Sequence, residues 1–216
     1  MKRAENQTRL ERRALDAERA GDDAGCTTWG LEEEKEELRE TRFERQKKKA
    51  ISWYWNASDL RGSAGAIWAS MHETEFASIP KRLGLGADFS FSIACPAVYL
   101  MLCGMALELL LKAVIVKKGG EPKHQHNLLD HWKEAGLEST ETQHGLLSIL
   151  TEAITWAGRY PVPKEEAKFD QFTELTWKHL FTPLGEESDF REPNGALSWE
   201  SFNQLWAQVC LYEPLI

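Results

Sequence analysis

The segment from Cys95 to Lys118 constrains the fold most, because it carries the strongest helix signal in the chain. It reads CPAVYLMLCGMALELLLKAVIVKK, and it is followed by Gly119-Gly120, which favours a helix end. A membrane-spanning helix needs ~20 predominantly apolar residues, and a charge pair within it is costly. Glu108 and Lys112 place such a pair here. The segment therefore predicts the buried central helix of a soluble bundle, with no membrane as partner.

Glu108 and Lys112 are the first candidate functional residues. Their i, i+4 spacing places both side chains on one face of the most apolar helix. Burying one charge alone is expensive, whereas a hydrogen-bonded pair is tolerable. Two interpretations stay open: an internal pair that fixes helix packing, or the polar floor of a cleft.

The apolar spacing elsewhere also favours helices. They are expected at 57–76, 127–135, 140–157, 164–181 and 198–212, with loops at 78–88 and 182–197. No sustained alternating pattern indicates a sheet. We predict an all-α fold, a helical bundle of about five main helices with a charged N-terminal helical arm.

Composition changes near residue 51 and predicts two parts, an arm at 1–50 and a helical domain at 51–216. The stretches 2–20 and 31–49 are rich in charged residues that favour helix, and their apolar anchors are sparse. The arm is either solvated and partly frayed or an oligomerising coiled coil. It holds 13 basic and 13 acidic residues, so the formal net charge of −8 belongs to the rest of the chain. That balance argues against bulk nonspecific nucleic-acid binding.

The four cysteines show no spacing typical of a metal site or a disulfide framework. The first fifty residues are too charged for a signal peptide. We therefore expect a cytoplasmic protein. His124, His126 and His131 lie close together, but their spacing matches no zinc pattern, so we expect no metal and no cofactor.

Arg159 and Tyr160 are the second candidate pair. They lie where a predicted helix ends against Pro161. An arginine there either binds the last helix carbonyls or holds a phosphate or carboxylate, while tyrosine can stack or donate a hydrogen bond. Together with His126, these residues and the Glu108–Lys112 pair form our candidate ligand-binding or active-site cleft; catalytic residues are not assigned.

Three pieces of the sequence together resemble the HEPN superfamily of small α-helical domains. GMALELLLK (104–112) is similar to a main helix of that family. Gly119-Gly120 followed by HNLL (126–129) resembles its turn and short-helix start, and GRYP (158–161) resembles a helix end of some members. The resemblance covers roughly 51–212.

This resemblance implies a helical fold, frequent homodimers and, in many members, metal-independent RNA cleavage in toxin–antitoxin, CRISPR and phage-defence systems. The usual motif is Arg, four to six residues, then His. Counting from Arg159, the histidine would occupy 164, 165 or 166, which hold Lys164, Glu165 and Glu166. None of the six histidines has an arginine at that distance upstream. The general acid/base usually assigned to that histidine is missing.

Our first hypothesis is therefore a HEPN-like binding or regulatory module in a defence or toxin–antitoxin-type system, without the standard nuclease site. We expect a homodimer, with a partner protein encoded nearby, RNA or a nucleotide as further candidate partners. The alternatives are a divergent metal-independent ribonuclease using Arg159, and a structural protein that assembles through its arm. Whether the protein is an enzyme stays open.

Overall fold

The computed structural model describes residues 41–86, 88–185 and 190–215. The chain divides into two compact units, Met1–Arg45 and Gln46–Ile216, which are considered separately. The helices predicted for the arm lie outside the described residues, apart from the short helix α3 at Arg42–Lys47. The candidate residues all belong to the second unit.

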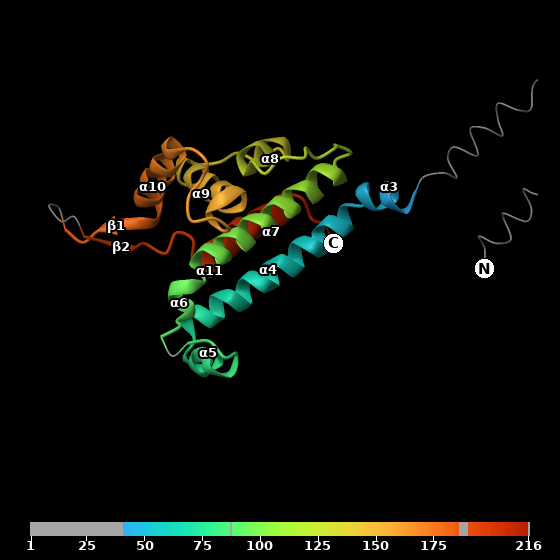
Figure 1. The fold of residues 1–216 in the computed structure, drawn as a ribbon. Helices are drawn as coiled ribbons and strands as arrows, with labels where there is room; N and C mark the ends of the chain where they lie inside the picture. The colour runs from blue at the N-terminus through green and yellow to red at the C-terminus, as the bar shows by residue number, and fades with distance from the viewer. Residues whose placement is uncertain (1–40, 87, 186–189, 216) are drawn as a thin grey trace, which may run out of the picture. The chain divides into compact units, whose positions relative to one another are not determined.

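The second unit is built from helices, with one small strand pair (Figure 1). Its helices are α4 (Ala50–His72), the 3₁₀ turn η1 (Thr74–Ser78), α5 (Ile79–Arg82), α6 (Phe91–Ala94), α7 (Pro96–Lys117), α8 (Leu128–Glu134), α9 (Glu141–Glu152), the π-helical turn η2 (Ala153–Ala157), α10 (Glu166–Leu180) and α11 (Trp199–Tyr212). The strands β1 (Phe181–Pro183) and β2 (Arg191–Pro193) pair antiparallel. The all-α prediction is confirmed, and within the described residues five helices reach twelve residues or more.

Helices α4 and α7 form the antiparallel pair on which the unit is built (Figure 1). Trp68 near the end of α4 lies 5.2 Å from Tyr99 near the start of α7, measured between ring centroids. The two helices differ in burial. More than half of α7 is buried, whereas Ala57 and Ala64 are the buried residues of α4.

Helix α7 begins and ends where the sequence predicts. Pro96 occupies its first turn, where a missing N–H is no loss. Gly119 follows the helix with a φ of +80°, a conformation that side chains with a Cβ rarely adopt. By length and composition α7 could cross a membrane, but 67% of its most apolar window is buried inside the protein. That burial is typical of a core helix, as the sequence indicates.

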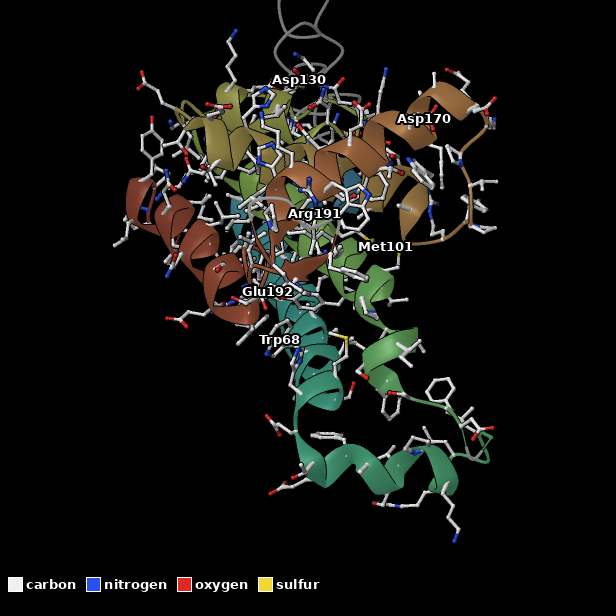
Figure 2. All side chains as sticks on the ribbon, turned by 90° about the vertical axis from the view of Figure 1, so that its left-hand side faces the viewer. Trp68, Met101, Asp130, Asp170, Arg191 and Glu192 are labelled. Atoms are coloured by element: carbon white, nitrogen blue, oxygen red, sulfur yellow. The ribbon has the colours of Figure 1, made fainter. Side chains whose placement is uncertain are left out.

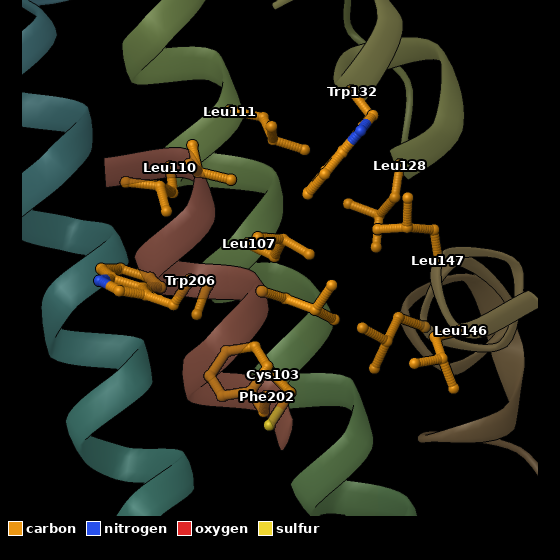
Figure 3. Close-up of a cluster of buried hydrophobic side chains, with 14 of the residues drawn as sticks. Cys103, Leu107, Leu110, Leu111, Leu128, Trp132, Leu146, Leu147, Phe202 and Trp206 are labelled. Atoms are coloured by element: carbon orange, nitrogen blue, oxygen red, sulfur yellow. The ribbon is translucent and has the colours of Figure 1, made fainter. Parts of the chain in front are cut away.

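The hydrophobic core gathers around α7 (Figure 3). Leu107, Leu110 and Leu111 are fully buried on α7, and they meet side chains from α8, α9 and α11. The other labelled members of this cluster are Cys103, Leu128, Trp132, Leu146, Leu147, Phe202 and Trp206. Each buried leucine contributes about 1.5–3 kcal/mol relative to an exposed one. The core therefore fixes α7 against three other helices.

Helix α9 and η2 cross α7 at a glycine. A Cβ placed on Gly104 would lie 2.8 Å from Cγ1 of Ile154 and 2.9 Å from the Leu150 carbonyl oxygen. A larger residue at 104 would therefore push the two helices apart. The predicted helix at 140–157 is present, but its last turn widens into the π-helical η2.

Three local features differ from the sequence prediction. The helix expected at 57–76 begins at Ala50 and ends at His72, because Trp53 and Tyr54 already belong to its packed face. The loop expected at 78–88 contains the four-residue helix α5. The loop expected at 182–197 contributes the β1–β2 ribbon, whose three-residue strands are too short to produce a sequence alternation.

Candidate functional site

Glu108 and Lys112 form a buried ion pair on α7. Lys112 Nζ donates to Oε1 of Glu108 at 2.6 Å, and the two residues are 5% and 7% exposed. Their i, i+4 spacing on one helix produces this contact, as the sequence predicts. A buried pair of this kind is stable only when further hydrogen bonds satisfy the remaining lone pairs and protons.

Those further hydrogen bonds come from the loop between α7 and α8. Nδ1 of His126 lies 3.0 Å from the second carboxylate oxygen of Glu108, and Lys112 Nζ lies 3.4 Å from the Gln125 carbonyl oxygen. The carboxylate is thus contacted on both oxygens. Because the His126 side chain is 59% exposed, the cluster extends from the core to the surface.

His131 of α8 joins the same cluster from the other side. Its ring is fully buried, and Nε2 donates to the Gln125 carbonyl oxygen at 2.9 Å. That carbonyl therefore receives hydrogen bonds from both His131 and Lys112. His131 and its chain neighbour Trp132 are both buried residues of α8.

The start of α8 holds this loop in place. The Asn127 side chain accepts from the backbone N–H groups of Leu129 and Asp130, which caps the helix. The Gln125 side chain donates to Asp130 at 3.0 Å, and the Leu128 N–H donates to Thr151 Oγ1 on α9 at 3.1 Å. His126 is therefore positioned by its neighbours on both sides as well as by Glu108.

Arg159 and Tyr160 lie at the end of η2. Both backbone N–H groups donate to the Trp156 carbonyl at 2.8 Å. The Arg159 guanidinium donates to the Thr155 carbonyl at 2.6 Å and lies 5.5 Å from the centroid of the Tyr160 ring. Of the two interpretations from the sequence, the arginine adopts the one that binds the last helix carbonyls.

The structure brings Glu108, Lys112 and His126 together, whereas Arg159 and Tyr160 follow η2, next to Gly158, which packs against an earlier turn of α7. The ideal Cβ of Gly158 lies 2.5 Å from Met101 Cβ, and Met101 precedes Glu108 by about 10 Å of helix. Within the described part of the chain, no hydrogen bond or ion pair links Arg159 or Tyr160 to the Glu108 cluster.

A cavity at the opposite end of α7 was not predicted from the sequence. It measures about 260 Å³ and lies among α4, α7, the β1–β2 ribbon and the start of α11. Its walls include Trp68, Tyr99 and Phe181. Since these come from three separate elements, only the recurring aromatic residues could have hinted at it. The Glu108 cluster does not line this cavity.

The positions that correspond to the family's usual histidine lie in solvent. Lys164, Glu165 and Glu166 are exposed, and Glu165 immediately precedes α10. Among the described residues, no group of three or more His, Cys, Asp or Glu is arranged to hold a metal ion. The candidate residues offer the Glu108 carboxylate, the Lys112 ammonium group, the His126 ring and the Arg159 guanidinium.

Comparison with known proteins gives one family. The model of the HEPN domain family matches residues 96–180, about two fifths of the chain. The match runs from the first residue of α7 to the last residue of α10, so it includes the Glu108 cluster and Arg159. No curated protein and no solved structure matches the chain.

Proposed function

From the HEPN domain at residues 96–180, we propose that the protein is a binding or regulatory module without the standard nuclease site, acting in a defence or toxin–antitoxin-type system. The proposal rests on the contacts of Arg159 and on the residues that follow it in the chain. One N–H of its guanidinium donates to the Thr155 carbonyl and the group lies near the Tyr160 ring, and the three positions where the family's histidine would follow are occupied by exposed Lys and Glu.

The Glu108 cluster supports the same function. Both oxygens of Glu108 have partners, and Lys112 binds Glu108 and a backbone carbonyl. Groups that are satisfied inside the fold have little free capacity for a substrate, and removing either would leave an uncompensated buried charge. The cluster therefore holds the loop before α8 against α7.

A homodimer is part of the proposal, and the exposed side of α4 is the surface we assign to it. Ile51 and Trp55 are 37% and 62% exposed, and Gly62 and Ala66 continue the same helical stripe. Nothing lies within 4 Å of an ideal Cβ on Gly62, so a second helix could approach closely there. Asp59 is the charged residue in the stripe and would need a partner across the interface.

Light scattering coupled to size exclusion tests the dimer. The full chain is expected to elute with twice the mass of one chain, and Trp55→Glu is expected to shift it to the monomer. Val162→Glu is the matched control, because Val162 is 60% exposed and lies after η2 instead of on α4. A monomeric parent chain would contradict the dimer, and equal dimerisation of Trp55→Glu would reject the α4 surface.

Single-stranded RNA tests binding without cleavage. With the full chain and end-labelled RNA, we expect fluorescence anisotropy to rise and then hold. A falling signal that Arg159→Ala abolishes would overturn the proposal in favour of a nuclease. Arg191→Ala is the matched control, since Arg191 also donates to a helix carbonyl, that of Trp177, and lies over that residue's ring at 5.7 Å. An unchanged signal would reject RNA as the partner and favour a protein.

A divergent ribonuclease is the second candidate, and one observation favours it. His126 contacts Glu108 through Nδ1 while most of its side chain remains exposed. A carboxylate that orients one ring nitrogen leaves the other free for proton transfer. If RNA is cleaved, we expect His126→Asn to abolish the cleavage and His124→Asn, a change at the exposed histidine two positions earlier, to leave it unchanged.

A further inference from the structure

A cleft among α8, α9 and α10 has no role in the function proposed above. It measures about 250 Å³, and its walls come from the start of α8, the last turns of α9 and the first half of α10. Asp130 on α8 and Asp170 on α10 mark two of these helices in Figure 2. The volume is slightly below the ~300–1,000 Å³ of drug-sized ligand sites, so a molecule that fills this α8–α10 cleft must be small.

Two residues of opposite charge line the α8–α10 cleft. Glu152 is the last residue of α9, and Lys168 belongs to the first turn of α10. The structure describes both residues, and they form no ion pair with each other. Among the described residues, Glu152 has no lysine or arginine partner, and Lys168 has no acidic partner. Both charges are therefore available to a ligand.

The Glu152 carboxylate is oriented by Trp156. Nε1 of Trp156 donates to Oε2 of Glu152 at 2.6 Å, and Glu152 is half-buried. Among the described residues, none donates a hydrogen bond to the other oxygen, Oε1. An ionised carboxylate accepts at both oxygens, so Oε1 is the acceptor that Glu152 offers to a ligand. Trp156 belongs to the π-helical η2, and such turns recur at functional sites.

Two further polar residues of the wall are fixed by the fold. The side-chain oxygen of Asn127 caps α8. Thr151 Oγ1 accepts from the Leu128 N–H at 3.1 Å and donates to the Leu147 carbonyl at 2.9 Å. This part of the cleft is therefore formed before a ligand arrives, which lowers the cost of ordering side chains on binding.

Apolar side chains complete the lining. Leu129, Phe172 and Leu175 belong to it, and each is only partly buried. An apolar group of a ligand that covers them removes their exposed area from water, which favours binding. A phosphate is disfavoured, because the lining would offer its negative charge one lysine and, beside it, the carboxylate of Glu152.

We propose that the α8–α10 cleft binds a small α-amino acid with an apolar side chain. Such a molecule carries both charges and no net charge, as the lining does. Its ammonium group donates to Oε1 of Glu152, and its carboxylate accepts from Nζ of Lys168. Lys168 is exposed and its stem is flexible, so its ammonium group can turn toward the ligand. The site does not depend on the function proposed above, because a protein that cleaves RNA, or that binds none, would keep the same cleft.

The test uses L-leucine and two analogues that each lack one charge. The amine 3-methylbutylamine lacks the carboxylate, and 4-methylpentanoate lacks the ammonium group. Calorimetry and saturation-transfer NMR with the full chain are expected to show saturable binding of L-leucine. Each analogue loses one charge-assisted hydrogen bond and should bind at least about tenfold more weakly.

Two variants locate the binding. Glu152→Gln keeps an acceptor for Trp156 but should bind L-leucine no better than 4-methylpentanoate, because the ammonium group has lost its partner. Lys168→Gln should likewise bind L-leucine no better than 3-methylbutylamine.

Glu166→Gln and Lys164→Gln are the matched controls, since they make the same changes at exposed positions that do not line the cleft. Both should bind L-leucine as the parent chain does. The proposal is overturned if L-leucine does not bind, if either analogue binds equally well, or if Glu152→Gln or Lys168→Gln binds L-leucine with the affinity of the parent chain.

Discussion

Glu108 and Tyr99, two of the buried polar residues of helix α7, differ in their hydrogen bonds. Glu108 has partners on both carboxylate oxygens, supplied by Lys112 and His126. Tyr99, about two and a half turns earlier, has the thiol of Cys103, a weak acceptor, beside its hydroxyl and no hydrogen bond of ordinary geometry. Both residues are more than nine-tenths buried, so burial does not explain the difference.

The difference lies in what packs around each of the two groups. The loop before α8 folds back onto Glu108 and completes its contacts, whereas the elements around Tyr99 leave a cavity. Native proteins leave few buried polar groups unpaired, and each exception calls for a reason.

The largest effect should come from breaking the complete cluster. Lys112→Met leaves the Glu108 carboxylate buried without its cation and should destabilise the protein by about 3–5 kcal/mol. Glu108→Gln with Lys112→Met removes both charges and should recover most of that loss. Urea unfolding of the single and double variants measures both values.

His126→Ala is the control for this pair, since its side chain is mostly exposed and the salt bridge to Lys112 remains. We expect it to lower stability by well under half of the Lys112→Met effect. If the single variant Lys112→Met were as stable as the parent chain, the cluster would not hold the loop against α7, and the contrast with Tyr99 would disappear.

The second effect concerns the Tyr99 end of α7 at high pH. Burial raises the pKa of the Cys103 thiol from 9.0 to about 12, although the Tyr99 hydroxyl lowers it slightly. A group with a raised pKa in the folded state stabilises fully below its unfolded pKa, and that stability is lost as the pH rises to the folded pKa. Between pH 9 and pH 10 the loss should be about 1 kcal/mol.

Urea unfolding at pH 8, 9 and 10 measures this decline. Cys103→Ala removes the titrating thiol, so its stability should fall less steeply over the same range, whatever its value at pH 8. Parallel curves for the two proteins would show that Cys103 does not take up its proton more tightly in the folded state.

The Glu108 contact could be predicted from the sequence because it is local. A Glu and a Lys four residues apart on an apolar helix have one near neighbour, each other. The return of His126 onto Glu108 could not be predicted, since it depends on how the loop after Gly119 folds back over α7. The same is true of the Gln125 carbonyl, whose role comes from backbone position and not from residue type.

The cavity was even less predictable from the sequence than the contacts of Glu108. Trp68, Tyr99 and Phe181 are separated by long stretches of sequence, and they meet only after α4, α7 and the β1–β2 ribbon have packed. The π-helical turn also leaves little trace, because one widened turn barely changes the apolar spacing of the segment before Gly158. Local periodicity predicted the main helices, whereas the position of the cavity depends on long-range packing.

The third effect tests how the complete cluster is held. Asn127→Ala removes the cap of α8 and should destabilise the protein by about 1 kcal/mol. Thr140→Ala is the matched control, because Thr140 caps α9 with the same kind of side-chain acceptor. Both variants should lose similar stability in urea. Only Asn127→Ala should shift the NMR signals of the His126 ring, and equal shifts in both variants would mean that the cap does not position His126.

The smallest effect tests the difference between Glu108 and Tyr99 most directly, because the sign of the stability change shows whether the Tyr99 hydroxyl is paired. Tyr99→Phe removes a buried hydroxyl that has no hydrogen bond of ordinary geometry, so the free energy of unfolding should rise by up to about 1 kcal/mol while the ring packing against Trp68 is kept. For a paired hydroxyl the same change lowers stability, since it removes a hydrogen bond. Urea unfolding at neutral pH measures the change. A stabilised variant would show that the hydroxyl is unsatisfied inside the fold. A destabilised variant would show that Tyr99 is satisfied within the fold, as Glu108 is, and the two ends of α7 would then not differ.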